Sequence, residues 1–401
     1  VSNLFSLRLA SAAIFLAIAP LAVFFFPYGP TIKLGVAIAA LAFLFSSLNQ
    51  IFIGVFQKNL RLDKVSLSEL SGRVILLMGV ILISRLSYGL IGIMVVMVIS
   101  SAVNCFLLYI FSGRFVRITF DYDKAVWREI FKKSWPIALT IFFNLIYLKT
   151  DILILSLVKT QSEVGIYGAA YRVIEVLITI PFMFAGVILP IITAAWAENN
   201  LEQFKKVFQK SFDFMAILAL PLSVGAQFLA KPIMILVAGK EFGEAGAVLR
   251  ILIFASSIIF LGSMFTHGII AINKQKEIIS AYIFTSIAAV AGYLIFIPRY
   301  SYFGAAWMTV ASELAIVLAS VYLIWKNTKI LPNLKIFSKS LLASLIMAAA
   351  LFLFMRANAW RPNLLAALIF AAIIYFVSLY IFRGISKKDL INLLPKPRIP
   401  S

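Results

Sequence analysis

The sequence has few of the side chains that crosslinks, metal sites and soluble surfaces require. Among 401 residues, Cys105 is the only cysteine and His267 the only histidine. This excludes an internal disulfide and a zinc site built from cysteine and histidine. Charged residues make up 13% of the chain, about half of the roughly 25% in ordinary soluble domains. No Gly-x-x-x-x-Gly-Lys-Ser/Thr motif is present, so no nucleotide-driven step is expected.

The sequence is rich instead in long apolar blocks. Apolar residues make up 63% of the chain, and each block approaches the ~20 residues that a helix needs to cross ~30 Å of hydrocarbon. The blocks lack the alternation of barrel strands, and only helices and closed barrels satisfy the backbone in lipid. The sequence therefore predicts an all-α polytopic membrane protein. We place its twelve predicted spans at about 7–26, 33–56, 70–87, 89–112, 134–158, 164–194, 211–238, 247–272, 278–297, 303–325, 336–355 and 363–382.

Basic residues lie mainly in alternate loops and account for the net charge of +20. About 23 Lys and Arg fall in one set of loops and about 8 in the other. The positive-inside rule then predicts that both ends of the chain are cytoplasmic, in agreement with an even number of spans. Some of these charges are expected to face anionic headgroups, and no nucleic-acid partner is expected. The stretch 384–401, with its prolines and basic residues, is typical of a short solvated tail.

The predicted loops are short on both sides of the membrane. The longest outer loop, at about 239–246, is under ten residues, and no cytoplasmic loop exceeds about 25 residues. No extracytoplasmic catalytic domain and no fused nucleotide-binding domain fit in such loops. We therefore expect a protein that is not an enzyme and that uses no cofactor and no metal.

The most densely charged part of the predicted spans is a hairpin that turns near residues 160–162. Lys149 and Asp151 precede the turn, and Arg172 and Glu175 follow it. At a rise of 1.5 Å per residue, all four lie in one layer, at least about 10 Å from the turn. Arg172 and Glu175 are three residues apart and share a helix face, whereas Lys149 and Asp151 are two apart and point in different directions.

Two interpretations of this layer are compatible with each other. In the first, the four charges form ion pairs that only hold the hairpin together. In the second, at least one cation, above all Arg172, lines a cavity and meets an anionic ligand, because the planar guanidinium suits phosphate. Both hold if Glu175 or Asp151 pairs with Arg172 in the empty site. We take Arg172, Lys149, Asp151 and Glu175 as substrate-binding candidates, and Glu313, near the middle of a predicted span, as a candidate for ion coupling.

Three stretches around this hairpin carry a resemblance to a known family. They are Trp-Pro-Ile-Ala-Leu at 135–139, Tyr-Leu-Lys-Thr-Asp-Ile-Leu-Ile-Leu at 147–155 and Val-Gly-Ile-Tyr-Gly-Ala-Ala-Tyr-Arg-Val at 164–173, followed by Ile-Pro at 180–181 and Leu-Pro at 189–190. The pattern resembles the start of the C-terminal lobe in bacterial polysaccharide repeat-unit flippases, which serve O-antigen or capsule synthesis. These belong to the multidrug/oligosaccharidyl-lipid/polysaccharide exporter superfamily.

The resemblance implies a fold of two six-helix lobes, often with two further C-terminal helices. Because the lobe-opening pattern falls on the fifth predicted span, it implies that the first two helices of the N-terminal lobe are absent. The expected organisation is an incomplete N-terminal lobe of four helices at 1–130, a C-terminal lobe of six helices at 131–330, and two extra helices with the tail at 331–401. Since the chain begins with Val1 rather than Met, a fragment or a misassigned start is expected.

The resemblance also implies a function. Such proteins move undecaprenyl-pyrophosphate-linked oligosaccharide units from the inner to the outer leaflet of the bacterial cytoplasmic (inner) membrane, by alternating access around a cationic cavity. The implied partners are this lipid-linked oligosaccharide, membrane lipids and the polysaccharide polymerase machinery. In the related peptidoglycan-precursor flippases, an arginine on the second helix of the C-terminal lobe lies in the cavity, and Arg172 matches that helix.

Other functions remain as alternatives. A drug/cation antiporter of the same superfamily would favour an anionic cavity, whereas the charged layer here is balanced. A peptidoglycan-precursor flippase differs only in its substrate. A membrane glycosyltransferase, ligase or polymerase usually carries a sizeable outer loop with catalytic residues, which this sequence lacks. A channel is disfavoured because no repeated pore motif is present.

Overall fold

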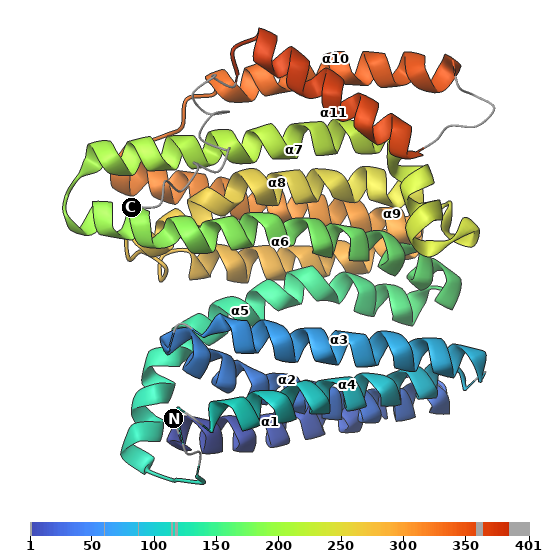
Figure 1. Ribbon diagram of the computed structural model, residues 1–401, viewed down its shortest axis with the longest axis vertical. Helices are drawn as coiled ribbons and strands as arrows, with labels where there is room; N and C mark the ends of the chain where they lie inside the picture. The colour runs from blue at the N-terminus through green and yellow to red at the C-terminus, as the bar shows by residue number, and fades with distance from the viewer. Residues whose placement is uncertain are drawn as a thin grey trace, which may run out of the picture. The chain divides into compact units, whose positions relative to one another are not determined.

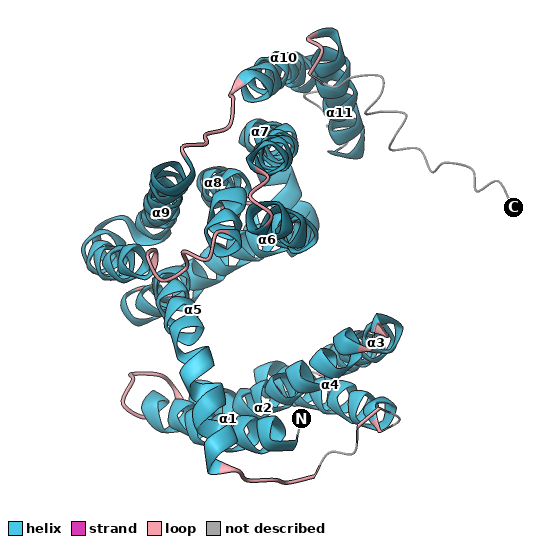
Figure 2. Ribbon diagram, turned by 90° about the vertical axis from the view of Figure 1, so that its left-hand side faces the viewer, coloured by secondary structure: helices cyan, strands magenta, loops and turns pink. Residues whose placement is uncertain are grey.

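The computed structural model describes residues 2–59, 61–86, 88–113, 115–116, 119–357 and 364–384. Within these residues all regular structure is helical (Figure 2). Most of the tail predicted at 384–401 lies outside them. The elements are α1 (Ser2–Val23), α2 (Pro30–Lys58), α3 (Leu62–Arg85), α4 (Gly89–Ser112), α5 (Lys124–Val158), α6 (Gln161–Ala197), α7 (Leu201–Ala238), the 3₁₀ turn η1 (Lys240–Phe242), α8 (Ala245–Ala271), α9 (Ile279–Thr328), α10 (Lys335–Ala357) and α11 (Leu364–Ile381).

The chain divides into two compact units, Val1–Trp135 and Pro136–Ser401, with the division inside α5. In the N-terminal unit α1–α4 lie side by side (Figure 1). There α2 packs against α1 and α4, and α3 packs against α4. Its core includes Phe52 and Phe56, which are one helical turn apart on α2, and Leu108 of α4. A single buried stripe on each helix is enough here, because the other faces are apolar and suit lipid.

The C-terminal unit is arranged around α8, which contacts α6, α7 and α9. α10 and α11 pack against each other and against α7. The hydroxyl of Tyr375 on α11 lies 2.7 Å from Ser340 Oγ of α10 and donates to the carbonyl of Ile217 on α7 at 2.8 Å. Hydrogen bonds between helices suit a membrane interior, since lipid leaves little hydrophobic drive for helix association.

α9 folds back on itself and accounts for two of the predicted spans. It has 50 residues, about 75 Å if straight, against a hydrocarbon core of ~30 Å. The helix is interrupted at Ser301, where φ is 50° and ψ is −136°. Gly292 packs closely on the Met308 side chain, and the Tyr293 hydroxyl lies 3.3 Å from Thr309 Oγ1. The two halves therefore lie side by side as a hairpin, covering the spans predicted at 278–297 and 303–325.

The span prediction is confirmed in the described part of the chain. Eleven helices there are long and apolar enough to cross a membrane, and α9 supplies two crossings. The two predicted spans separated by only a few residues, 70–87 and 89–112, correspond to α3 and α4. The protein is thus a multi-pass helical membrane protein.

Candidate functional site

The charged layer lies on the hairpin formed by α5 and α6. Thr160 caps α6: its Oγ1 accepts a bond from the Glu163 backbone N–H at 3.3 Å, and its own N–H donates to the Glu163 carboxylate at 3.0 Å. This reciprocal capping box fixes where α6 begins. Because it fixes the first turn of α6, it also sets the depth at which Arg172 and Glu175 face α5.

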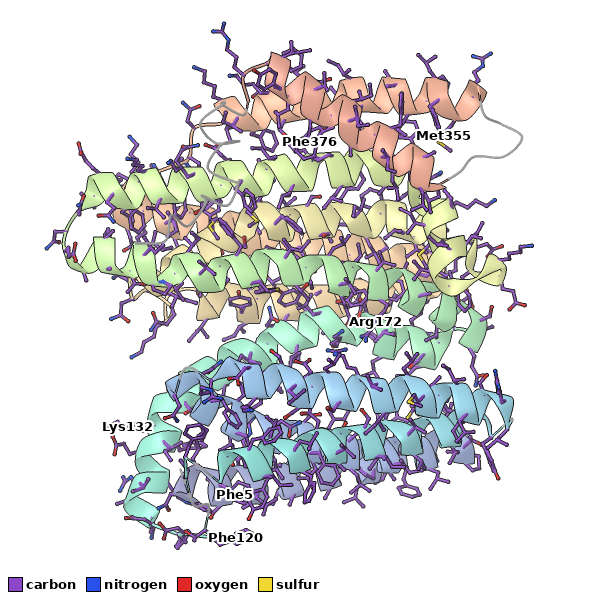
Figure 3. All side chains as sticks on the ribbon, in the orientation of Figure 1. Phe5, Phe120, Lys132, Arg172, Met355 and Phe376 are labelled. Atoms are coloured by element: carbon purple, nitrogen blue, oxygen red, sulfur yellow. The ribbon has the colours of Figure 1, made fainter. Side chains whose placement is uncertain are left out.

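The structure brings three of the four predicted residues into direct contact. Glu175 Oε1 lies 2.5 Å from Lys149 Nζ, and its other oxygen lies 2.8 Å from Arg172 Nη1. The single carboxylate of Glu175 therefore neutralises only part of the positive charge of these two cations, which lie on two helices. The Arg172 side chain (labelled in Figure 3) is 80% exposed and that of Lys149 is 48% exposed, whereas that of Glu175 is 29% exposed. Both cations thus keep free surface for another anion.

A cavity of about 110 Å³ adjoins this cluster. Lys149 Nζ lies 4.7 Å from the ring centroid of Tyr171, a cation–π arrangement that orients the ammonium group at the cavity wall. The Tyr171 hydroxyl donates to the Leu148 carbonyl at 2.9 Å, which holds the ring in place. The lining residues are Lys149, Asp151, Ile152, Gly168, Tyr171 and Glu175.

Asp151 does not join the cluster of ion pairs and is 1% exposed. The Tyr167 hydroxyl donates to Asp151 Oδ2 at 2.5 Å, the Thr309 hydroxyl lies 3.4 Å from the same oxygen, and the Ile152 N–H lies 2.7 Å from Oδ1. No cation lies within 4.0 Å of its carboxylate among the described residues. The expectation that Lys149 and Asp151 point in different directions agrees with this geometry.

Glu313, the predicted coupling residue, lies in the same buried region of the C-terminal unit. It is 5% exposed on the second half of α9, close to Tyr147 of α5. The Tyr293 hydroxyl donates to the Tyr147 carbonyl at 2.9 Å and lies 3.3 Å from Thr309 Oγ1. Thr309 in turn contacts Asp151. Thr309 and Tyr293 therefore link Asp151 to the Tyr147 backbone, and Glu313 lies close to the same tyrosine.

The sequence indicates the charges of this region but not the role of its tyrosines. Tyr147, Tyr167 and Tyr293 are each 2% exposed or less. One signal was available: Tyr167 stands about as far after the hairpin turn as Asp151 stands before it. The pairing with Tyr293 depends on how α9 packs, which no local pattern predicts.

Other candidates for chemistry are absent from the described residues or have structural partners. No group of three or more His, Cys, Asp or Glu could hold a metal ion in the described part of the chain. His267 Nδ1 lies 2.8 Å from the Ser263 carbonyl one turn earlier on α8. The arrangement that remains is a pair of accessible cations beside a buried carboxyl network.

The amino-acid sequence of this chain is similar to those of proteins of polysaccharide synthesis. A family model described as polysaccharide biosynthesis protein matches residues 1–247. Capsular polysaccharide biosynthesis protein CapF of Staphylococcus aureus is 22% identical over 295 residues, which are 73% of this chain and 74% of that protein. Probable low-salt glycan biosynthesis flippase Agl15 of Haloferax volcanii is 24% identical over 250 residues, 61% of this chain and about half, 53%, of that protein.

Solved structures of transporters share the fold. A structure of the lipid II flippase MurJ in an inward closed conformation has a TM-score of 0.77 at 17% identity, covering 96% of this chain and 84% of that one. An inward-facing multidrug resistance MATE family transporter of the MOP superfamily has a TM-score of 0.66 at 14% identity, covering 82% and 81%. At these identities the likeness concerns the fold alone.

Proposed function

The chain belongs to the polysaccharide biosynthesis protein family, and on that premise we propose that it is a flippase for a lipid-linked glycan. In the finer form of the proposal, the cargo is an undecaprenyl-pyrophosphate-linked repeat unit for O-antigen or capsule. It moves across the bacterial cytoplasmic membrane by alternating access. In this mechanism the two moving lobes are residues 1–130 and 131–330, and residues 331–401 form two extra helices and a tail. Both ends of the chain are cytoplasmic in this proposal.

One observation carries the proposal: Lys149 and Arg172 share a single carboxylate, Glu175, beside a cavity within the membrane-spanning part of the protein. Cations inside spans are costly and are usually retained for function. A pyrophosphate offers oxygens on two phosphoryl groups, so it can meet both cations together. Arg172 supplies a planar fork and Lys149 a compact point charge.

In this proposal Glu175 acts as an internal substitute for the ligand. With the cavity empty, it keeps both cations paired and so reduces the cost of holding them in the membrane. An entering pyrophosphate displaces Glu175 from one or both of them. The exchange of one anion for another keeps binding reversible, which a carrier needs in order to release its cargo.

We assign coupling to the buried network rather than to the cation pair. Both carboxyl groups are buried, Asp151 beside the hydroxyls of Tyr167 and Thr309 and Glu313 close to Tyr147, and neither has a cation within 4.0 Å among the described residues. A carboxyl group in that setting can gain or lose a proton, or accept a small cation, with a large change in local energy. The network joins α5, α6 and α9, so its charge state can affect how these helices pack.

Complementation tests the proposal. The chain is expressed in a bacterium that lacks its own repeat-unit flippase, and surface polysaccharide is measured. We expect rescue by the unmodified chain, a loss of about tenfold or more in Arg172→Ala and Lys149→Ala because a charge-assisted bond is removed, and only partial activity in Arg172→Lys. Lys205→Ala, at an exposed position on α7, serves as the matched control.

The outcomes separate the site from the function. Normal export by Arg172→Ala would contradict the site while leaving the flippase proposal intact. No rescue by an inserted, stable chain, together with resistance to cationic drugs, would favour the antiporter alternative. Export that requires a particular polymerase would identify that machinery as a partner.

A further inference from the structure

The first turns of α5 form a surface that the proposed transport does not use. α5 has 35 residues, but its apolar membrane-spanning part is Ile141–Val158. Residues 124–135 belong to the N-terminal unit and precede that span. In Figure 1 these first turns run across the ends of α1 and α2 rather than alongside them, and Figure 2 shows the same crossing from the end.

Contacts with α1 place this segment at the edge of the hydrocarbon. Asn3 Nδ2 donates to the Asp121 carboxylate at 2.8 Å, and its Oδ1 accepts from the Asp123 N–H at 2.7 Å. The Asp121 N–H donates to Ser6 Oγ at 2.9 Å. Because Asn3 begins the candidate span Asn3–Val23, the chain just before α5 is held at the level where that span starts.

The start of the helix is equally well defined. Asp123 Oδ1 accepts bonds from the N–H groups of Ala125 and Val126 at 2.8 and 3.3 Å, as an N-terminal cap does. The rings of Tyr122 and Trp127 meet edge to face, with 4.8 Å between centroids. The orientation of the side chains that follow is thereby set relative to α1.

Two stripes run along this helix. Lys124, Arg128 and Lys132 recur every fourth residue and are exposed, and in Figure 3 Lys132 extends away from the helices of its unit. Trp127, Phe131 and Trp135 recur with the same spacing, and Trp127 and Phe131 each stand one position before a basic residue. At 100° per residue the two stripes are adjacent. Phe131 is 70% exposed and Trp135 49% exposed.

We propose that residues 124–135 bind the anionic phospholipids of the bilayer surface. The basic stripe binds phosphate headgroups, while Phe131 and Trp135 enter the boundary between headgroups and acyl chains. A basic stripe beside an aromatic one is the arrangement of helices that lie in the membrane interface. Four basic residues against one acidic residue, Glu129, give the segment its charge complementarity to such lipids.

Basic charge alone does not produce this surface, as the start of α7 shows. Lys205, Lys206 and Lys210 there are exposed, but the neighbouring aromatic residues Phe204 and Phe208 are turned into the core, at 0% and 1% exposure. That helix has basic residues with no outward aromatic stripe. It is therefore the matched control for the proposal.

The test uses the full chain in nanodiscs, with Cys105→Ala as background and Phe131→Cys labelled with bimane. Quenching of the label is compared between brominated phosphatidylglycerol and brominated phosphatidylcholine. We expect at least about twofold stronger quenching by phosphatidylglycerol. The ratio should fall to about one in Lys124→Gln/Arg128→Gln/Lys132→Gln, while Lys205→Gln/Lys206→Gln/Lys210→Gln should leave it unchanged.

Three results would overturn the proposal. Equal quenching by the two lipids in the unaltered stripe would remove the preference for anionic headgroups. Absence of quenching by either lipid would place Phe131 away from the bilayer. The basic stripe would then be expected to bind an acidic protein surface instead. If the α7 control variant lost the preference for phosphatidylglycerol equally, the preference would depend on the total charge of the protein and not on residues 124–135. A second label at Trp135→Cys guards against a defect confined to position 131.

Discussion

At the scale of single residues, the main feature is the unequal treatment of four charges in one layer. Lys149 and Arg172 are both accessible and share Glu175, whereas Asp151 is enclosed by hydroxyl and amide donors. A shared carboxylate leaves each cation only partly neutralised, and a neighbouring anion can then compete for it. This is why the carboxylate, together with the two cations, is expected to set the affinity of the site for an anion.

Glu175→Gln tests that role. The amide keeps the shape of the side chain but removes the charge that pairs Lys149 and Arg172. We expect the Kd for undecaprenyl pyrophosphate, measured on purified protein in detergent, to fall by about 3- to 10-fold, equivalent to about 1 kcal/mol. Glu175→Asp, which keeps the charge, is the control. An unchanged Kd in a stably folded Glu175→Gln protein would contradict the competition.

Glu313→Gln tests coupling. If Glu313 exchanges a proton or small cation, the neutral amide should abolish the stimulation of flipping by an imposed ion gradient in proteoliposomes while leaving basal flipping measurable. Ser320→Ala, at a buried position on the same half of α9, controls for disturbance of the helix. Full gradient stimulation in Glu313→Gln would exclude this residue as the coupling group.

At the scale of elements, the tip of the α5–α6 hairpin is tied to the turn of α9. Ser301 Oγ donates to Glu163 Oε1 at 2.6 Å, and Lys159 Nζ donates to the Pro298 carbonyl at 3.1 Å. Ser301 itself adopts a positive φ, which usually costs a residue other than glycine some energy. These bonds help to hold the turn of α9. The geometry of this turn sets which side chains of α9 face Asp151.

Gly304→Ala is expected to destabilise this turn. A Cβ at Gly304 would lie 2.5 Å from the Phe296 carbonyl oxygen, a backbone atom that cannot rotate away. Forcing an extra carbon into such a site costs about 1–3 kcal/mol, so the temperature of thermal unfolding in detergent should fall. Gly186→Ala on α6, where a Cβ would meet nothing within 4 Å, should leave it unchanged or slightly higher. Equal behaviour of the two variants would argue against the tight turn.

At the scale of the whole molecule, the distribution of basic residues sets the expected orientation in the membrane. Lys205, at the start of α7, belongs to a cluster of lysines, whereas Lys240 follows the other end of the same helix and is the only basic residue of the sequence between 239 and 246. The positive-inside rule assigns the first to the cytoplasm. The same rule gives the proposed cytoplasmic location of both ends of the chain.

Cysteine labelling tests this orientation. In a Cys105→Ala background, Lys240→Cys should react with a membrane-impermeant maleimide in intact cells. Lys205→Cys should react only after the membrane is permeabilised, because its side of α7 is expected to be cytoplasmic. Both positions are exposed, so burial would not explain a difference. The reversed pattern would invert the topology.

The sequence by itself determined the membrane class, the number of spans and the layer of charges. A bilayer admits few backbone structures, and helical rise is constant, so hydropathy predicts the spans and spacing predicts the depth of Lys149 and Arg172. It also carried the resemblance that led to the family. Only the tertiary structure decided which groups meet. Glu175 faces two cations, and Asp151 meets Tyr167 and a threonine of α9, because helix packing sets the direction of each side chain. That packing depends on contacts between residues far apart in the sequence, which no local pattern contains.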